Sequence, residues 1–222
     1  MTPTSPAAVF WDMDGTLVDT EPYWVSAETD LIESFGGSWT HEEALQLVGA
    51  GLWHSARIIQ AKGVALTEDE IIDALTDRVL EQLATKGIPW RPGARELLLE
   101  LREAGVPTAL VTMSISRMAH FVVEHLGFEG FDAVVSGNDV THSKPHPEPY
   151  LHAARILGVD PALSVALEDS PPGVASAAEA GMVTIGIPFI LDLTSSSATH
   201  LWPTLDGRTL ADLAALVPAV SS

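Results

Sequence analysis

The sequence contains no cysteine, and this absence removes several kinds of chemistry at once. Without thiols the chain cannot form a disulfide, cannot bind a metal through sulfur and cannot use a cysteine nucleophile. Any metal ion must therefore bind through oxygen or imidazole ligands.

Basic residues are scarce. The chain has 11 lysines and arginines against 30 aspartates and glutamates, which gives a formal net charge of −19. Such an excess of negative charge opposes binding to nucleic acid or to an anionic membrane surface, so we expect neither as a partner. If the substrate is an anion, the binding site must supply its own local cation.

Long apolar runs are also missing. No run approaches the roughly 20 residues of a membrane-spanning helix, and the first ten residues lack the basic start and long apolar stretch of a signal peptide. We therefore expect a cytoplasmic protein, and a monomer. With 222 residues, of which 46% are hydrophobic, the chain can bury the core of one domain, or of one domain with an insert.

Short apolar runs rich in strand-forming residues recur along the chain, and helix-like patterns separate the last four of them. The runs cover residues 7–11, 108–111, 133–135, 164–167 and 183–187. This alternation predicts an α/β fold with a Rossmann-like parallel sheet and helices on both faces. A surface helix with a frayed end is expected at the C-terminus, in residues 210–222.

About 90 residues separate the first two runs, whereas an ordinary crossover needs a dozen or more. Residues 21–87 show no strand pattern, and Thr-x-x-Glu capping boxes at Thr40 and Thr67 mark helix starts. We therefore predict a small all-helical domain at 21–87, inserted into a core made of residues 1–20 and 88–222.

Chemically active side chains follow the ends of the predicted strands, where open parallel sheets bind their ligands. These side chains are Asp12, Asp14, Thr112, Ser114, Lys144, Glu168 and Asp169. Crowded carboxylates repel one another unless a cation lies among them, so an oxygen-ligated Mg²⁺ is the simplest resolution. Together with the lysine, the metal would give this acidic protein a positive site for a phosphate.

Four segments of the chain resemble, in order, the four motifs of the haloacid dehalogenase superfamily. They are DMDGTLVDTE (12–21), the hydroxyl at Thr112, SKPHPEPY (143–150) and LEDSPPGVASAAEAGM (167–182). The resemblance is to the phosphatase and phosphomutase branch, and it covers nearly the whole chain. It implies that the helical insert is a cap domain.

The resemblance implies a nucleophile, an acid–base residue and a metal site. Asp12 would attack phosphorus and form an aspartyl phosphate, and Asp14 would protonate the leaving alcohol and then deprotonate water. Mg²⁺ would be held by Asp12, the backbone carbonyl of Asp14 and Asp169, with Glu168 bound directly or through water.

Phosphate binding is implied for Thr112, Met113 and Lys144, which would contact the transferring oxygens. Taken singly, these residues have ordinary structural explanations. Thr112 could be a plain β-branched strand residue and Lys144 a solvated loop lysine. In the same way, Asp14 could belong to a simple Asp-Gly turn, and the acids after the fourth run could cap the next helix.

The cap is expected to carry substrate contacts. VGAGLWHSARI (48–58) resembles the cap loop that meets substrate in relatives, which makes Trp53, His54 and Arg57 candidates, although aromatic residues at helical spacing are more often core. The mutases of this branch have a histidine at the position of Trp24. An indole has no basic nitrogen, so Trp24 favours a phosphatase, unless it is simply cap core.

His142, His146 and His152 flank Lys144 and raise the possibility of zinc. The segment HSKPH is a proline-broken loop, not a helix that presents histidines four residues apart, so we do not expect a zinc site there. His142 and His146 remain candidates for the entrance of the phosphate site.

Together these features predict a Mg²⁺-dependent phosphatase of a small phosphorylated metabolite, most simply a sugar phosphate. A β-phosphoglucomutase-like phosphomutase shares all four motifs and is the nearest alternative. A non-catalytic phosphate-binding protein is a further alternative, disfavoured by the complete set of acids and the lysine.

Overall fold

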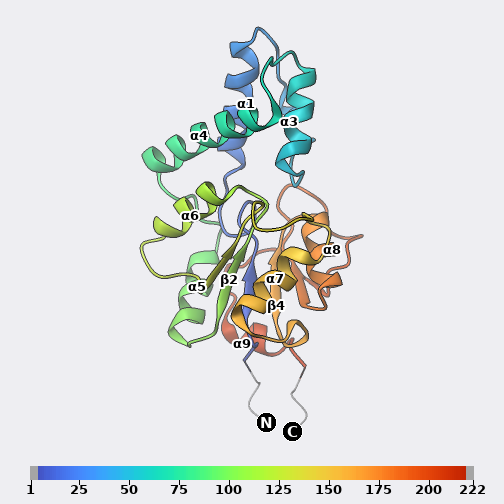
Figure 1. Ribbon diagram of the computed structural model, residues 1–222. Coiled ribbons are helices and arrows are strands. Elements are labelled where there is room, and N and C mark those ends of the chain that lie inside the picture. Colours follow the sequence, from blue (N-terminus) through green and yellow to red (C-terminus); the bar gives the residue numbers. More distant parts are fainter. Residues whose placement is uncertain (1–4, 219–222) are drawn as a thin grey trace. The chain divides into compact units, whose positions relative to one another are not determined.

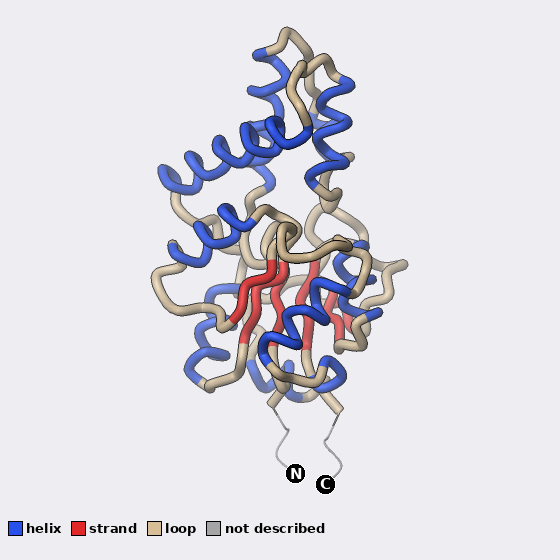
Figure 2. The backbone as a smooth tube through the Cα atoms, viewed as in Figure 1, coloured by secondary structure: helices blue, strands red, loops and turns tan. Residues whose placement is uncertain are grey.

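The computed structural model describes residues 5–218, and the chain divides into two compact units. One unit comprises Met1–Val18 and Trp90–Ser222, and the other comprises Asp19–Pro89. Within the described residues, every strand belongs to the first unit, and the second unit contains only helices and loops (Figure 2).

The first unit is built on a six-stranded parallel sheet with the order β3-β2-β1-β4-β5-β6. Its strands are β1 (Val9–Trp11), β2 (Thr108–Val111), β3 (Ala133–Val135), β4 (Val165–Glu168), β5 (Val183–Gly186) and β6 (His200–Leu201). The first five confirm the predicted strands. The sequence analysis missed β6 because a two-residue, partly exposed edge strand leaves no apolar run.

Helices cover both faces of this sheet, as predicted. They are α5 (Ala94–Glu103), α6 (Ser116–Glu124), α7 (Glu148–Leu157), α8 (Pro171–Glu179) and α9 (Leu210–Ala214), with a short 3₁₀ turn at Pro161–Leu163. Right-handed crossovers place α5 and α6 on one face and α7 and α8 on the other (Figure 1). Of the predicted C-terminal helix, 210–214 forms α9, and residues 219–222 lie outside the described residues.

The centre of the sheet determines where ligands can bind. Val9 of β1 pairs with Thr108 of β2 on one side and with Val165 of β4 on the other. The chain moves outward from β1 toward β3 and then returns to β4, so the strand order reverses between β1 and β4. In open parallel sheets this reversal opens a crevice at the carboxyl ends of the strands.

The core on the α7 and α8 face combines large and small side chains. Phe10 of β1 meets Tyr150 of α7 edge to face, with ring centroids 6.3 Å apart, and alanines such as Ala153 and Ala177 fill the space beside them. Small residues allow the two helices to lie close to the strands. Tyr150 is fully buried, and its hydroxyl therefore needs a partner inside the protein.

The second unit contains four helices. They are α1 (Glu21–Ser34), α2 (His41–Leu45), α3 (Leu52–Ala61) and α4 (Glu68–Lys86), and α4 packs against both α1 and α3. Both predicted capping boxes form: Thr40 and Thr67 each accept from the third residue of the helix, whose glutamate accepts the cap N–H in return. No helix in residues 5–218 is long and apolar enough to span a membrane.

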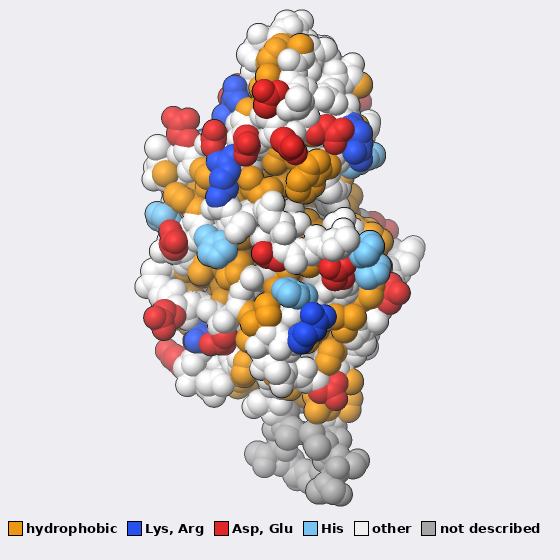
Figure 3. Space-filling model, in the orientation of Figure 1, with side chains coloured by type: hydrophobic (Ala, Val, Ile, Leu, Met, Phe, Trp, Pro, Cys, Tyr) orange, Lys and Arg blue, Asp and Glu red, His pale blue; other side chains and the backbone are white. Residues whose placement is uncertain are grey.

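Helix α4 is amphipathic. Its buried face consists of Ile71, Ile72, Leu75, Thr76, Val79 and Leu83. Its exposed acids are Asp69, Glu70, Asp73, Asp77 and Glu81. In the space-filling view, acidic side chains likewise lie in a row over the helical unit (Figure 3), in keeping with the net charge of −19.

Glu28 of α1 is a buried acid within the helical unit. Its side chain accepts a hydrogen bond from Trp39 Nε1 at 3.1 Å, and the residue is 6% exposed. Burial raises the pKa of Glu28 to about 8 against the effect of this hydrogen bond, and the negative charge of Glu21 adds to the rise. Glu28 is therefore protonated at neutral pH.

The raised pKa of Glu28 predicts that the stability of the folded chain depends on pH. Between the ordinary glutamate pKa of 4.5 and about 8 the folded chain keeps a proton that the unfolded chain releases, so stability falls as pH rises through this window and levels off above it. In urea titrations, Glu28→Gln should remove a slope of about 1.4 kcal/mol per pH unit. The exposed Glu33→Gln on the same helix is the control. Equal slopes in wild type and Glu28→Gln would contradict the assignment.

Candidate active site

Asp12 immediately follows β1 and is largely buried, at 8% exposure. Its backbone N–H donates to the carbonyl of Leu167 on β4 at 3.1 Å, which fixes its position at the sheet edge. The turn that follows is tight: Gly15 has φ +89°, and a Cβ on it would come within 2.1 Å of Asp169 Oδ2. Glycine is needed here for its conformation and because the Asp169 carboxylate lies against the turn.

Asp14 lies in this turn and is held by a hydroxyl from a neighbouring strand end. Ser114 Oγ donates to Asp14 Oδ2 at 2.8 Å, and the backbone N–H of Ser114 donates to Thr112 Oγ1 at 3.0 Å. Thr112 follows β2 and is 1% exposed. The first two predicted strand ends therefore come together, with Ser114 as a link between them.

Lys144 enters the acid cluster as a buried cation. Its Nζ donates to Asp12 Oδ1 at 2.7 Å, to Glu168 Oε1 at 2.6 Å and to the carbonyl of Val111 at 2.9 Å, so all three ammonium protons are used. Its side chain is only 6% exposed, which excludes a solvated loop lysine. Its backbone N–H also lies 3.4 Å from the sulfur of Met113.

The charges around Lys144 set its protonation. Burial lowers the pKa of the lysine, but the carboxylates of Asp12 and Glu168 outweigh burial and hold the pKa above its usual value. The ammonium is therefore permanent at any working pH. It is a buried local cation at the carboxyl edge of the sheet of an acidic protein.

Glu168 ends β4 and has no exposure to solvent. Besides Lys144, its Oε1 accepts a hydrogen bond from the hydroxyl of Tyr150, and its Oε2 accepts from Ser170 Oγ at 3.4 Å. A Cβ on Gly173 would lie 1.9 Å from Oε2, so the start of α8 closes over the carboxyl group. Burial first and repulsion by Asp12 second raise the pKa of Glu168 to about 7.

Asp169 completes a cluster that can hold a metal. Asp12, Glu168 and Asp169 offer carboxylate oxygens within 4.8 Å of one another. Burial, followed by the charges of Asp12 and Glu168, raises the pKa of Asp169 well above its usual value. The cluster thus contains three buried carboxyl groups and one ammonium. Its possible metal ligands are all oxygen atoms and its net charge is negative, which fits a hard divalent cation.

The candidate residues of the helical unit lie on α1 and α3. Trp53 is 38% exposed and donates from Nε1 to Asp69 at 3.0 Å, while Arg57 pairs with Glu68 at 3.2 Å. His54 is exposed, and Trp24 is half-buried in α1. Trp53 and Arg57 thus bind the start of α4 within their own unit. Substrate contact by these residues stays a prediction.

The family follows from a comparison of the whole chain with known proteins. Residues 9–187 match the model of the haloacid dehalogenase-like hydrolases. The chain is a haloacid dehalogenase-like hydrolase. The match runs from the first residue of β1 to the residue after β5, so it includes every carboxylate of the cluster and Lys144.

Relatives of this hydrolase include named sugar phosphatases. It is 32% identical to hexitol phosphatase B of Escherichia coli (strain K12), over 90% of this chain and 96% of that protein. It is 30% identical to the fructose-1-phosphate phosphatase YqaB of the same strain, over 82% and 96%. Among solved structures, CbbY from Rhodobacter sphaeroides in complex with phosphate matches with a TM-score of 0.85 and 29% identity, covering 94% of this chain and 99% of CbbY.

One residue of this hydrolase's site was not identified from the sequence, and another was named there without a role. Tyr150 ends the segment SKPHPEPY, and Ser114 follows Thr112 by two positions. Both hydroxyls contact a carboxylate of the site. The sequence analysis named Ser114 for its place just past a strand end but did not connect it with Asp14. The signal for Tyr150 was an aromatic residue on the first turn of the helix that follows the lysine loop.

Proposed function

We propose that this hydrolase is a Mg²⁺-dependent phosphatase of a small phosphorylated sugar or polyol, and that it acts through an aspartyl phosphate at Asp12. The observation that supports this most is Lys144 Nζ, buried between Asp12 and Glu168 at the carboxyl edge of the sheet. It gives a carboxylate nucleophile and a phosphate-binding cation at one point. Two relatives are named for phosphatase action on a hexitol and on fructose 1-phosphate.

The first step forms the covalent intermediate. A carboxylate oxygen of Asp12, which contacts Lys144, attacks phosphorus while the bond to the leaving oxygen breaks. Asp14, in its carboxylic acid form, gives its proton to that oxygen, and Ser114 keeps the carboxyl group oriented. The products of this step are the free alcohol and the aspartyl phosphate.

The second step returns the enzyme to its starting state. Asp14, now a carboxylate, takes a proton from a water molecule whose oxygen attacks phosphorus. The bond between phosphorus and Asp12 breaks, which releases inorganic phosphate and restores both side chains. Lys144 and the Thr112 hydroxyl stabilise the phosphoryl oxygens in both steps.

Asp12 and Asp169 would hold Mg²⁺, with the Asp14 carbonyl and Glu168 as further ligands, direct or through water. Bound there, Mg²⁺ supplies positive charge to the phosphoryl oxygens. The hydrogen bonds of Glu168 also give it a second role, because its Oε1 holds both Lys144 and Tyr150 in place.

The helical unit acts as a cap that selects the substrate, and Trp53, His54 and Arg57 are the residues that we propose for this selection. Trp24 favours hydrolysis over phosphoryl transfer between sugar hydroxyls. Its indole cannot exchange a proton at a basic nitrogen, as the histidine of the mutases can. Water is then the acceptor of the phosphoryl group.

A phosphate-release assay tests this function. The enzyme is offered hexitol phosphates, fructose 1-phosphate and β-glucose 1-phosphate, each with Mg²⁺ and with a chelator. We expect Mg²⁺-dependent release from at least one sugar or polyol phosphate. With β-glucose 1-phosphate and a bisphosphate primer we expect inorganic phosphate, if any product forms, and little glucose 6-phosphate. Isomerisation at least as fast as release would instead identify a mutase, and no release from any ester would refute the proposal.

The role of Asp14 predicts a dependence on the leaving group. Asp14→Asn should slow phosphorylation by a sugar phosphate about 10²- to 10⁴-fold, the usual contribution of general acid catalysis. It should slow phosphorylation by p-nitrophenyl phosphate much less, because that phenolate scarcely needs a proton. Single-turnover rates measure both. Equal losses for the two esters would contradict an acid role, and Ser114→Ala should reproduce the same pattern in weaker form.

A further inference from the structure

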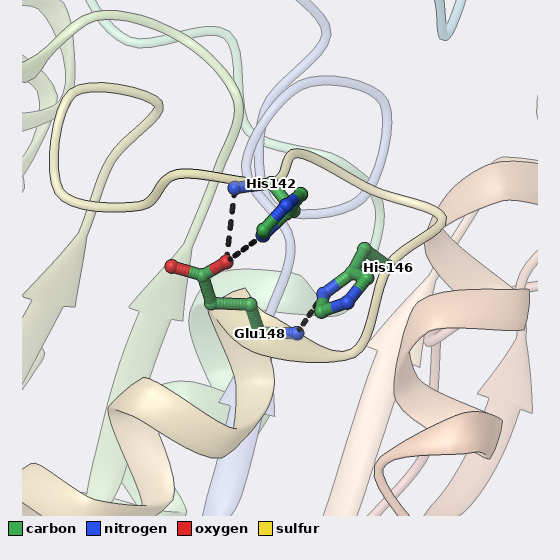
Figure 4. Close-up of side chains that lie close together, drawn as sticks. All are labelled: His142, His146 and Glu148. Carbon is green, nitrogen blue, oxygen red and sulfur yellow. Dashed lines mark hydrogen bonds and ion pairs between the residues drawn. The ribbon is translucent and has the colours of Figure 1, made fainter.

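A second cluster of possible metal ligands lies on the loop that carries Lys144. The rings of His142 and His146 stack with centroids 4.5 Å apart, and Glu148, from the first turn of α7, reaches toward the same point (Figure 4). His142 Nδ1 lies 2.7 Å from Glu148 Oε2, and the backbone N–H of Glu148 donates to His146 Nδ1 at 3.2 Å.

The three side chains offer a ligand set of two imidazoles and one carboxylate. Their ligand atoms lie within 4.8 Å of one another. Two histidines and a glutamate with further positions open to solvent form a recurrent zinc ligand set. We propose that His142, His146 and Glu148 bind a borderline divalent transition cation such as Zn²⁺, at a second metal site separate from the acid cluster.

Ligand chemistry distinguishes this site from the first one. The cluster around Asp12 consists of buried carboxylates, which suit Mg²⁺, whereas imidazole nitrogens favour zinc, nickel and copper. The second cluster also lies open to solvent, with the His142 side chain 60% exposed and that of Glu148 27% exposed. A transition cation can therefore reach the second cluster from solvent, and its preference for imidazole favours this cluster over the acid cluster.

The carboxylate is ready to act as a ligand. The backbone N–H of Thr141 and the His142 side chain lower the pKa of Glu148 to about 2, so it is ionised throughout the working pH range. Binding replaces the direct contact between His142 Nδ1 and Glu148 Oε2 with bonds from both groups to the metal. Ligands of a tetrahedral zinc stand roughly 3.3 Å apart, so the 2.7 Å pair must open slightly, which exposed side chains allow.

The position of the site gives it a consequence for the phosphate-binding lysine. His142 and His146 lie two residues before and two residues after Lys144, and Glu148 lies two residues before Tyr150. A cation bound to all three ligands joins both ends of the lysine loop to the start of α7. It thereby restrains the segment from which Lys144 and Tyr150 reach Glu168.

Calorimetric titration with Zn²⁺ in saturating Mg²⁺ tests the proposal, since Mg²⁺ then fills the acid cluster. Wild type should bind one equivalent of Zn²⁺, and His142→Ala/His146→Ala should weaken that binding by more than about 100-fold, the upper end of the cost of losing an outer-shell partner. The control is His120→Ala/His125→Ala, which removes two exposed imidazoles from α6 and its C-cap and leaves the cluster intact. It should bind like wild type.

Glu148→Gln is a second variant, because an amide keeps an acceptor for the Thr141 N–H but loses the charge. It should also weaken Zn²⁺ binding. Hydrogen exchange supplies a readout at the loop itself: the amides of 141–148 should exchange more slowly with Zn²⁺ in wild type and in the control, but not in the cluster variants. The proposal is overturned if wild type binds no equivalent, if the cluster variant binds as tightly as wild type, or if the control loses the same binding.

Discussion

Asp12→Asn should lower kcat by at least about 10⁴-fold, because losing the nucleophile of a covalent mechanism removes most of the rate enhancement. An amide cannot form the acyl phosphate, and it also loses the charge that pairs with Lys144 and that would hold Mg²⁺. Steady-state phosphate release from the best substrate measures the effect. A variant that kept more than about a hundredth of the wild-type kcat would contradict covalent catalysis.

The same variant should remain folded. Three buried acids surround one ammonium, so removing one charge relieves repulsion in the metal-free protein. Thermal unfolding without divalent metal should therefore show a midpoint equal to or above that of wild type. The matched control is Asp132→Asn, an exposed aspartate beside the amino end of β3 that pairs with Arg102, and it should retain activity.

Lys144→Met should reduce both activity and stability. Removing one partner of a buried ionic network leaves the other charges uncompensated and costs about 3–5 kcal/mol. Losing the positive charge that stabilises the phosphoryl oxygens costs about a further 10²- to 10³-fold in kcat. Urea titration and phosphate release measure the two effects. Wild-type stability in Lys144→Met would show that the lysine does not balance the acids.

A double variant separates these two roles of the lysine. Lys144→Met/Glu168→Gln removes the ammonium together with one of the carboxylates that it pairs with. We expect it to regain much of the lost stability in the metal-free protein while activity stays low, because the cation for the phosphate is still absent. Recovery of activity in the double variant would contradict phosphate binding by Lys144.

The α/β fold could be predicted from the sequence because each central strand is a short, uninterrupted apolar run, as buried parallel strands require. All residues of β1, β2 and β4 are buried, so their pattern is unambiguous. Edge strand β6 could not be found in the same way. Its pairing with β5 comes from the path of the chain, not from its composition.

The site was partly predictable for a similar reason. Carboxylates placed at the ends of parallel strands must meet at the sheet edge, so the sequence predicted that Asp12, Glu168 and Asp169 lie close together. How deeply Lys144 is buried could not be read in this way, because the lysine comes from a loop and its depth depends on packing against β1, β2 and β4. The hydroxyl of Tyr150 likewise acquires its partner only through tertiary structure.

The histidines show what a local sequence pattern leaves out. Considering only helical presentation, the sequence analysis did not expect a metal site in HSKPH. In the structure the loop turns so that His142 and His146 stack, and Glu148, the third ligand that we propose, comes from the start of α7. A ligand set that spans a loop and a helix end has no fixed sequence spacing by which to recognise it.

The most direct measurement of the central claim is mass spectrometry of enzyme quenched in acid within one turnover of a sugar phosphate. The account predicts a transient gain of one phosphoryl group, located on the peptide that contains Asp12. The gain should disappear as free phosphate appears, and it should be absent in Asp12→Asn. Phosphate release at the wild-type rate with no phosphorylated peptide at any time, or with the phosphoryl group on another residue, would contradict the account.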